Sequence, residues 1–175
     1  MSSIDLVILG IVLEKPRSAY DIQKDVEHHH FSRWTKISAP SIYRKVLQLC
    51  EKGYLQSDIV KGNRNSDKAI YSITENGKKY FEKLMALYIA EPIPLQFDFN
   101  VVIANLIKME KKEGLYLLER LKENIIASLH SLENYEITYA GITLGGKTIF
   151  EQQRLLYQAL LEWLDNFRSQ YQENR

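Results

Sequence analysis

Two short strand-like runs lie within a chain whose remaining segments have helical patterns, and they constrain the fold most. Residues 54–60 and 69–74 are rich in Tyr, Ile and Val, whereas residues 61–68 between them are polar and contain turn-forming Gly and Asn. Such runs on either side of a polar loop predict a single β-hairpin. We therefore expect a mainly α-helical chain with one small hairpin.

Two helices are predicted at the start of the chain. Ser2 and Asp5 form a capping-box pattern ahead of the apolar residues 6–13, which favour a helix although a buried strand fits the same run. Ser18 and Asp21 repeat the capping-box pattern. We expect them to open a second helix whose inward residues are Ile22 and Val26.

Two more helices flank the hairpin. After a loop at residues 31–37, a third helix is expected to begin at Ser38 or Pro40 and to end at Gly53. Thr74 is the expected N-cap of a fourth helix. The apolar residues at helical spacing in this fourth helix are Phe81, Leu84 and Tyr88.

The proline-containing residues 91–94 break the helical pattern and predict a domain boundary. We expect a first domain at residues 1–90 and a second at residues 91–175. Residues 1–80 hold 13 Lys/Arg and 9 Asp/Glu, a balance of +4, whereas residues 81–175 have a balance of −3. This asymmetry indicates that the first domain faces a polyanion and the second has another task.

The second domain is predicted to be helical. A short helix is expected at residues 99–109, followed by a long helix, a glycine-rich corner at residues 141–146 and a last helix opened by Thr148 and Glu151. The long helix repeats apolar residues every seven positions, at Leu118, Ile125, Leu132 and Tyr139, with Leu121 and Tyr135 beside them. The expected stripe of the last helix is Ile149, Leu156, Leu160, Trp163 and Phe167.

This order of elements predicts an N-terminal winged helix-turn-helix followed by a C-terminal helical dimerisation domain. Two long amphipathic helices cannot bury both of their faces within so small a domain, so they require a partner. The first domain of the same chain could supply that partner, but a second copy of the helices fits better, and we expect a homodimer.

The third helix carries the residue types that contact DNA. Its expected inward face is Ile42, Val46, Leu49 and Cys50. Hydroxyl, guanidinium, ammonium and amide groups on the other face are those that bases and phosphates require, although an ordinary solvated face has similar residues. Arg44 and Gln48 could reach bases, and Ser41 suits a phosphate. The expected DNA-contacting residues of this helix are Ser41, Tyr43, Arg44, Lys45 and Gln48.

The hairpin loop adds Lys61, Arg64 and Lys68 to this expected DNA-contacting set. A wing lies along the minor groove or the backbone, where the potential is strongly negative. By itself the loop is better explained as an ordinary polar turn. Its position directly after a candidate recognition helix favours the DNA contact.

No pattern in the sequence indicates an enzyme, a metal site or a bound cofactor. Three consecutive histidines, His28 to His30, point in directions about 100° apart on a helix and cannot converge on one ion. Cys50 has no base in its sequence neighbourhood and is better explained as a core residue. We expect a cytoplasmic protein without a membrane-spanning segment.

Trp163 has two interpretations. Aromatic residues at helical spacing mostly fill a core or an interface. Trp163 could also stack on a flat hydrophobic ligand, and we keep it as a candidate ligand-binding residue.

Several segments of the first domain together resemble the PadR-like transcriptional regulators. Residues 6–13 are similar to that family's first helix, and residues 18–22 (Ser-Ala-Tyr-Asp-Ile) to its Ser-Gly-Tyr-Glu-Ile signature. Residues 41–55 are similar to its recognition helix and the junction to the wing, and residues 71–77 to its Tyr-x-Leu-Thr-x-x-Gly stretch. The wing departs from the family's common basic and aromatic run. The second domain resembles the larger, virulence-activator-like type in length and helical pattern.

The resemblance implies a dimeric regulator, a repressor, that binds an inverted-repeat operator in double-stranded DNA. Its half-sites should lie about one helical turn, roughly 34 Å, or a multiple of it apart. The family also implies a small hydrophobic or phenolic effector. The competing hypothesis is a winged-helix module that binds protein rather than DNA, because the net charge of +1 gives little long-range attraction to DNA.

Overall fold

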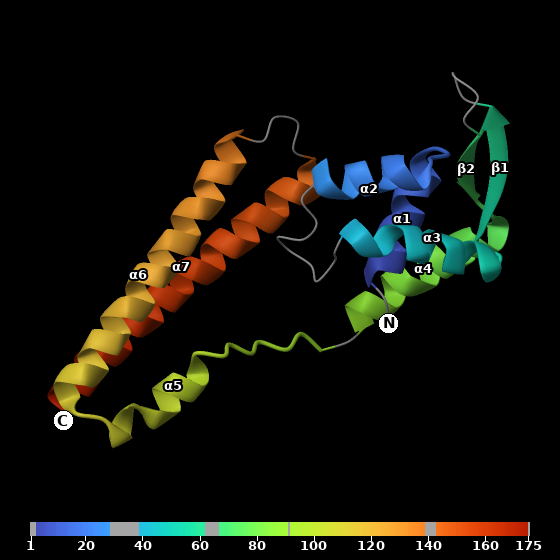
Figure 1. Ribbon diagram of the computed structural model, residues 1–175. Helices are drawn as coiled ribbons and strands as arrows, with labels where there is room; N and C mark the ends of the chain where they lie inside the picture. Colours follow the sequence, from blue (N-terminus) through green and yellow to red (C-terminus); the bar gives the residue numbers. More distant parts are fainter. Residues whose placement is uncertain (1–2, 29–38, 62–66, 91, 139–142, 175) are drawn as a thin grey trace. The chain divides into compact units, whose positions relative to one another are not determined.

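The structure is a computed structural model that describes residues 3–28, 39–61, 67–90, 92–138 and 143–174 (Figure 1). The chain divides into two compact units, Met1–Pro94 and Leu95–Arg175. The loop expected at residues 31–37 lies outside the described residues. The described elements of the first unit are α1 (Ser3–Glu14), α2 (Ala19–His28), the 3-10 turn η2 (Ala39–Ser41), α3 (Ile42–Glu51), β1 (Leu55–Lys61), β2 (Asp67–Ile73) and α4 (Glu75–Ala90).

One apolar core joins the helices of the first unit. Ile8 and Leu9 of α1, Ile22 of α2 and Val46 of α3 are fully buried, and Leu84 contributes from α4. Each buried aliphatic side chain of this size stabilises the fold by roughly 1.5–3 kcal/mol. The helical interpretation of residues 6–13 is confirmed, as is the inward position of Ile22.

The predicted hairpin is confirmed. Strands β1 and β2 pair antiparallel from Leu55 opposite Ile73 to Lys61 opposite Asp67. Gly53 lies between α3 and β1 with φ of 71° and donates its N–H to the carbonyl of Cys50 at 2.8 Å. Glycine adopts this left-handed conformation at low cost, so it allows the chain to leave the helix and enter the strand at once.

The start of α4 is fixed against the base of the hairpin. The hydroxyl of Thr74 accepts the N–H of Gly77 at 3.0 Å and donates to the carbonyl of Gly53 at 2.7 Å. A Cβ atom at Gly77 would collide with the carbonyl of Tyr54, so a glycine lets the helix approach the strand closely. The expected N-cap role of Thr74 is confirmed.

The third helix differs at both ends from the prediction. Residues 39–41 form the 3-10 turn η2, and α3 begins only at Ile42 and ends at Glu51. Pro40 has no N–H and a fixed φ, and it lies inside the tight turn that leads into the helix rather than at its first α-helical residue.

The second unit contains α5 (Asn100–Asn105), the 3-10 turn η3 (Leu106–Lys108), α6 (Lys111–Thr138) and α7 (Leu144–Glu173) among its described residues. The two long helices lie side by side along their length (Figure 1). Leu118, Ile125 and Leu132 of α6 are buried, as the seven-residue repeat predicts, and Tyr139 lies outside the described residues.

The C-terminal end of α7 is tied to the start of the second unit. The hydroxyl of Tyr171 donates to the carbonyl of Leu106 at 3.1 Å in a buried position. A Cβ atom at Gly114 of α6 would overlap the ring of Tyr171. Gly114 therefore makes room for the aromatic ring that holds η3 against the helix pair.

The last helix begins earlier than predicted. Thr143 is its N-cap and accepts the N–H of Gly146 at 3.2 Å, so Gly145 and Gly146 belong to the first turn and Thr148 lies within the helix. Both threonines are chemically suitable caps. The sequence predicts that the two glycines lie in a corner before the helix, because glycine has a low helix propensity. In the first turn of α7 the N-cap and the partner helix offset this low propensity.

The predicted stripe of α7 is only partly confirmed: Leu160 and Phe167 pack against the core of the second unit, whereas Leu156 and Trp163 are substantially exposed. Phe150, Tyr157, Leu164 and Tyr171, which are seven residues apart, pack toward α6. This spacing matches the seven-residue repeat of α6 and packs the two helices as a pair. Ion pairs joining α6 to α7 are Lys122–Asp165, Glu119–Arg168 and Glu136–Arg154.

Candidate nucleic-acid interface

Helix α3 has one buried face and one outward face. Ile42, Val46 and Leu49 are buried in the core, as predicted, and Cys50 is half-buried. Burial raises the pKa of the Cys50 thiol, which keeps it neutral at physiological pH and suits a core residue. The opposite face carries the exposed residues Tyr43, Arg44, Leu47 and Glu51, with Gln48 half-buried beside them.

Leu47 is a member of this outward face that sequence reasoning missed. Its side chain is 55% exposed, and Tyr43, one turn earlier, is 48% exposed. Residues four apart lie on the same side of a helix, so they form a small apolar area beside Arg44 and Gln48. The signal in the sequence was a leucine whose position does not fit the inward spacing of Ile42, Val46 and Leu49.

Lys45 points toward α1 rather than outward. Its ammonium lies 2.9 Å from Oδ1 of Asp5, a residue that is almost completely buried. The hydroxyl of Tyr80 in α4 also faces this carboxylate, and burial together with the charge of Asp5 raises the pKa of Tyr80. Asp5 thus joins three helices, and no short-range sequence pattern indicated this role.

The three basic residues expected on the wing have different positions. Lys61 is exposed at the end of β1, and Arg64 lies outside the described residues. Lys68 is the second residue of β2, and its ammonium lies 3.0 Å from Oδ2 of Asp21. Of the predicted set, the structure brings Tyr43, Arg44 and Gln48 together on one helix face.

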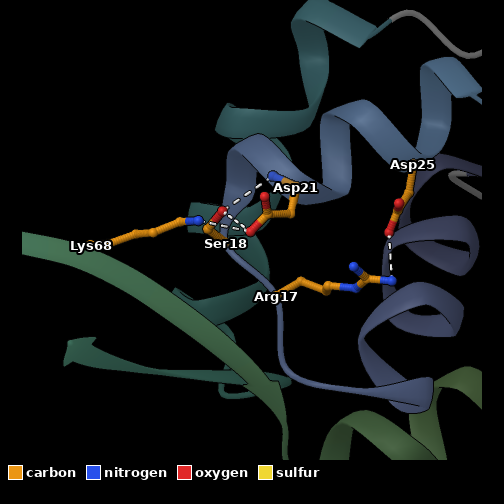
Figure 2. Close-up of polar contacts among 5 residues, drawn as sticks. All are labelled: Arg17, Ser18, Asp21, Asp25 and Lys68. Carbon is orange, nitrogen blue, oxygen red and sulfur yellow. Dashed lines mark hydrogen bonds and ion pairs between the residues drawn. The ribbon is translucent and has the colours of Figure 1, made fainter. Parts of the chain in front are cut away.

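Figure 2 shows a polar cluster where α2 begins. The hydroxyl of Ser18 donates to Oδ2 of Asp21 at 2.6 Å and accepts the backbone N–H of Asp21 at 3.1 Å, so the predicted N-cap is confirmed, with the carboxylate of Asp21 bound to the hydroxyl of Ser18 rather than to its backbone N–H. The hydrogen bond from Ser18 and the ammonium of Lys68 hold the pKa of Asp21 below its usual range. The carboxylate is therefore ionised and fixed in orientation at physiological pH.

A short backbone pairing lies next to this cluster. Arg17 donates its N–H to the carbonyl of Tyr71 at 3.0 Å and accepts the N–H of Tyr71 at 2.7 Å. The guanidinium of Arg17 lies 3.1 Å from the carboxylate of Asp25 in α2 (Figure 2). Strand β2 therefore has β1 on one edge and Arg17, two residues before α2, on the other.

Trp163 lies in a row of aromatic rings in the second unit. Its ring stacks on Phe167 with centroids 5.9 Å apart and an interplanar angle of 3°, and Phe99 is tilted against it at 6.0 Å. Phe97 stacks on Phe99, and Tyr171 follows Phe167. Trp163 thus both packs and remains accessible, with 37% of its surface exposed.

The histidines offer no metal centre within the described part of the chain. His28 is the exposed last residue of α2, and His29 and His30 lie outside the described residues. The described residues contain no group of three His, Cys, Asp or Glu side chains arranged to hold a metal ion. None of the described helices is long and apolar enough to cross a membrane.

Three helices followed by a hairpin, with a polar face on the third helix, define a winged helix-turn-helix domain. Residues 8–83 match the model of the transcriptional regulator PadR-like family. The first unit of the chain is thus similar to a family of transcription regulators. No curated protein sequence is significantly similar to this chain.

Solved structures share the fold over nearly the whole chain. Bacillus subtilis PadR in complex with operator DNA superimposes with a TM-score of 0.76 at 18% identity, covering 97% of this chain and 99% of that one. A PadR-like regulator from Bacillus cereus gives 0.66 at 23% identity, covering 98% and 99%. The Vibrio cholerae virulence activator AphA gives 0.69 at 16% identity, again covering 98% and 99%. The similarity thus includes the C-terminal helices as well as the winged helix.

Proposed function

We propose that the protein is a dimeric regulator, a repressor, that binds an inverted-repeat operator through its winged helices. The observation that carries this proposal is the outward face of α3, where Arg44 and Gln48 flank an exposed apolar pair. A helix of this composition suits the major groove, since it offers both hydrogen-bonding and apolar groups to base edges. The operator complex of Bacillus subtilis PadR, a protein with the same fold, supports this use of the domain.

The residues of the face differ in the contacts that they suit. Arg44 can bond the O6 and N7 atoms of guanine, and Gln48 the N6 and N7 atoms of adenine. Leu47 offers an apolar contact to a thymine methyl group. Phosphate contacts position the protein without reading sequence. The residues that suit them are Ser41 at the end of η2, Tyr43 on α3, and Lys61 and Arg64 of the hairpin.

Lys45 stands apart from the DNA-contacting set that the sequence predicts. Its ammonium is already paired with Asp5, and a buried carboxylate that lost this partner would be strongly destabilising. We therefore assign Lys45 to holding α3 on α1. Lys45 therefore contributes to DNA binding indirectly, by holding α3 in place.

The second unit supports the proposal of a homodimer. Several large apolar side chains of its helices remain exposed although α6 and α7 pack against each other. A second copy would cover such a surface, as in the self-complementary interfaces of twofold dimers. The exposed apolar residues in question are Val101, Ile107, Leu155, Leu156 and Trp163.

We further propose that a planar hydrophobic effector modulates DNA binding. Bacillus subtilis PadR, with the same fold over 98% of this chain at 18% identity and a TM-score of 0.75, has been solved in complex with p-coumaric acid. The exposed part of Trp163, beside Phe99 and Phe167, is a surface on which a flat ring could stack. An effector of this kind acts by binding one dimer arrangement more tightly than another.

Selection from a pool of randomised duplex DNA with the full-length protein tests this function. We expect enrichment of an inverted repeat whose half-sites are separated by about one helical turn or a multiple of it. The variant Arg44→Ala, whose side chain is exposed, is the matched control and should fail to enrich the same sequence. A pool that stays random after repeated rounds would contradict the proposal and favour a protein-binding winged helix.

A further inference from the structure

We propose that Lys68 is a positioning residue of the wing: paired with the carboxylate of Asp21, it latches β2 onto the start of α2 and is not one of the phosphate contacts. The inference rests on the proposed DNA binding, because the wing's position matters only if the wing meets DNA. It assigns to Lys68 a role different from that of Lys61 on the neighbouring strand. We call the Ser18–Asp21–Lys68 contacts the wing latch.

The carboxylate of Asp21 is built to receive an ammonium. Ser18, only 3% exposed, donates its hydroxyl to Oδ2 and accepts the backbone N–H of the same aspartate. The contacts within the Ser18–Asp21 pair orient the carboxylate independently of Lys68. The ammonium of Lys68 then lies 3.0 Å from that same Oδ2 (Figure 2).

A second attachment lies three residues further along the same strand. The two backbone hydrogen bonds between Arg17 and Tyr71 hold β2 to the segment that enters α2, and Arg17 is itself paired with Asp25. Strand β2 is thus fixed at Lys68 by a side chain and at Tyr71 by the backbone. With two attachments, the strand can neither slide nor swing freely relative to α2.

Lys68 lies close to the end of the hairpin, where fixing the strand has the largest effect on the direction of the wing. The last described pair of the ladder is Lys61 opposite Asp67, so Lys68 is one residue from the end of the described hairpin. Fixing the strand here limits the directions in which this end of the hairpin can extend toward DNA.

The charges around Lys68 distinguish a positioning role from a direct phosphate contact. An ammonium beside an ionised carboxylate contributes little net positive charge to a polyanion, whereas Lys61 makes no ion pair with any residue that the structure describes. If Lys68 contacted phosphate, the adjacent carboxylate of Asp21 would oppose DNA binding. Removing that negative charge would then strengthen binding, but breaking a latch would weaken it.

The test measures DNA affinity of the full-length protein over a series of salt concentrations, with the duplex that the wild type enriches. We expect Asp21→Asn and Lys68→Gln each to weaken binding by about two- to fivefold, the range that a partly exposed ion pair can supply. The double variant should bind no more weakly than the single ones, because both break the same contact. The conservative variants Asp21→Glu and Lys68→Arg should keep nearly the wild-type affinity.

The slope of log K against log salt distinguishes the two roles, because a change in stability alone would not alter this slope. Lys61→Gln, the matched lysine on β1, should reduce the slope of log K against log salt by about 0.9, the value for one phosphate contact. Lys68→Gln should leave the slope unchanged. Thermal unfolding of each variant confirms that the fold persists at the assay temperature.

Two results would overturn the latch. One is tighter DNA binding by Asp21→Asn, and the other is a loss of slope in Lys68→Gln equal to that in Lys61→Gln. Failure of the proposed function itself would appear separately, as an absence of salt-dependent binding by the wild type. In that case the protein does not bind DNA through its wing, and both the proposed function and the positioning role of Lys68 are rejected.

Discussion

The ammonium of Lys45 lies 2.9 Å from a carboxylate oxygen of Asp5, which joins the helix with the proposed DNA-binding face to the first turn of α1. The side chain of Asp5 is only 5% exposed. A carboxylate removed from water in this way needs a partner, because an unpaired buried charge is strongly destabilising. The pair therefore explains a lysine at this position without any contact to DNA.

Replacing Lys45 by Met is expected to lower the free energy of unfolding by about 2–3 kcal/mol, because the buried carboxylate of Asp5 loses its ammonium partner and keeps only the hydroxyl of Tyr80. Urea denaturation at neutral pH measures the change. The matched control is Arg44→Met on the adjacent, exposed residue, which should change stability by less than about 0.5 kcal/mol. Equal stability of the two variants would show that the buried pair does not hold the helix.

Arg44→Ala is expected to show the opposite behaviour. Its unfolding should be nearly unchanged, but operator binding should weaken by about 1–3 kcal/mol, the range for a side chain that reads a base. Fluorescence anisotropy with labelled operator DNA gives the affinity. Unaltered affinity would mean that the outward face of α3 does not read the major groove.

Leu47 predicts a thymine in the half-site whose methyl group contributes to affinity. Replacing that thymine by uracil, which lacks only the methyl group, should weaken binding by the wild type by about three- to tenfold, because burial of one such group is worth roughly 0.8 kcal/mol or somewhat more. The variant Leu47→Ala should be insensitive to the same replacement. A wild type that binds both duplexes equally would exclude this contact.

Two glycines of the second unit should respond differently to alanine. Gly114→Ala should destabilise the protein by about 1–3 kcal/mol, because the added carbon overlaps the ring of Tyr171 and forces a shift in a packed core. At Gly145 the nearest atom to an added Cβ is 4.0 Å away, so alanine should be neutral or stabilising by up to about 1 kcal/mol. Thermal unfolding compares them, and an undisturbed Gly114→Ala would contradict the described packing of Tyr171.

The capping carboxylate predicts a pH dependence of stability. The pKa of Asp21 is lowered in the folded protein by the hydrogen bond from Ser18 and by Lys68. A lowered pKa means that the ionised group stabilises the fold above its unfolded pKa of about 3.9, and that this stabilisation is lost as the pH falls through the lower folded value. Asp21→Asn should therefore be less stable than the wild type at pH 7, by an amount that shrinks in acid. A stability difference that is constant from neutral to acid pH would exclude this coupling.

The local elements of the fold could be predicted because their signals are local. The N-cap at Ser18, the C-terminal cap glycine Gly53 and the N-cap at Thr74 involve residues close in sequence, and the structure confirms each. The start of α7 could not be chosen correctly, since Thr143 and Thr148 are equally good caps by composition. Packing against α6 favours the earlier one.

The candidate site was only partly accessible to sequence reasoning. The outward positions of Arg44 and Tyr43 follow from helical periodicity, because the buried residues of α3 fix the opposite face. The partners of Lys45 and Lys68 are 40 and 47 residues away in the sequence, and only the tertiary fold brings them together. The basic residues of the predicted DNA-contacting set thus differ in the structure: Arg44 is exposed, whereas Lys45 and Lys68 form ion pairs.

The measurement that tests the account most directly is a fluorescence-anisotropy titration of the full-length protein against the duplex that it enriches. A scrambled duplex of equal length serves as control, and both are titrated at a low and a high salt concentration. We predict tight binding to the enriched duplex alone, weakened steeply by salt because phosphate contacts release counterions. Equal binding to both duplexes, or binding indifferent to salt, would contradict a winged helix that reads an operator.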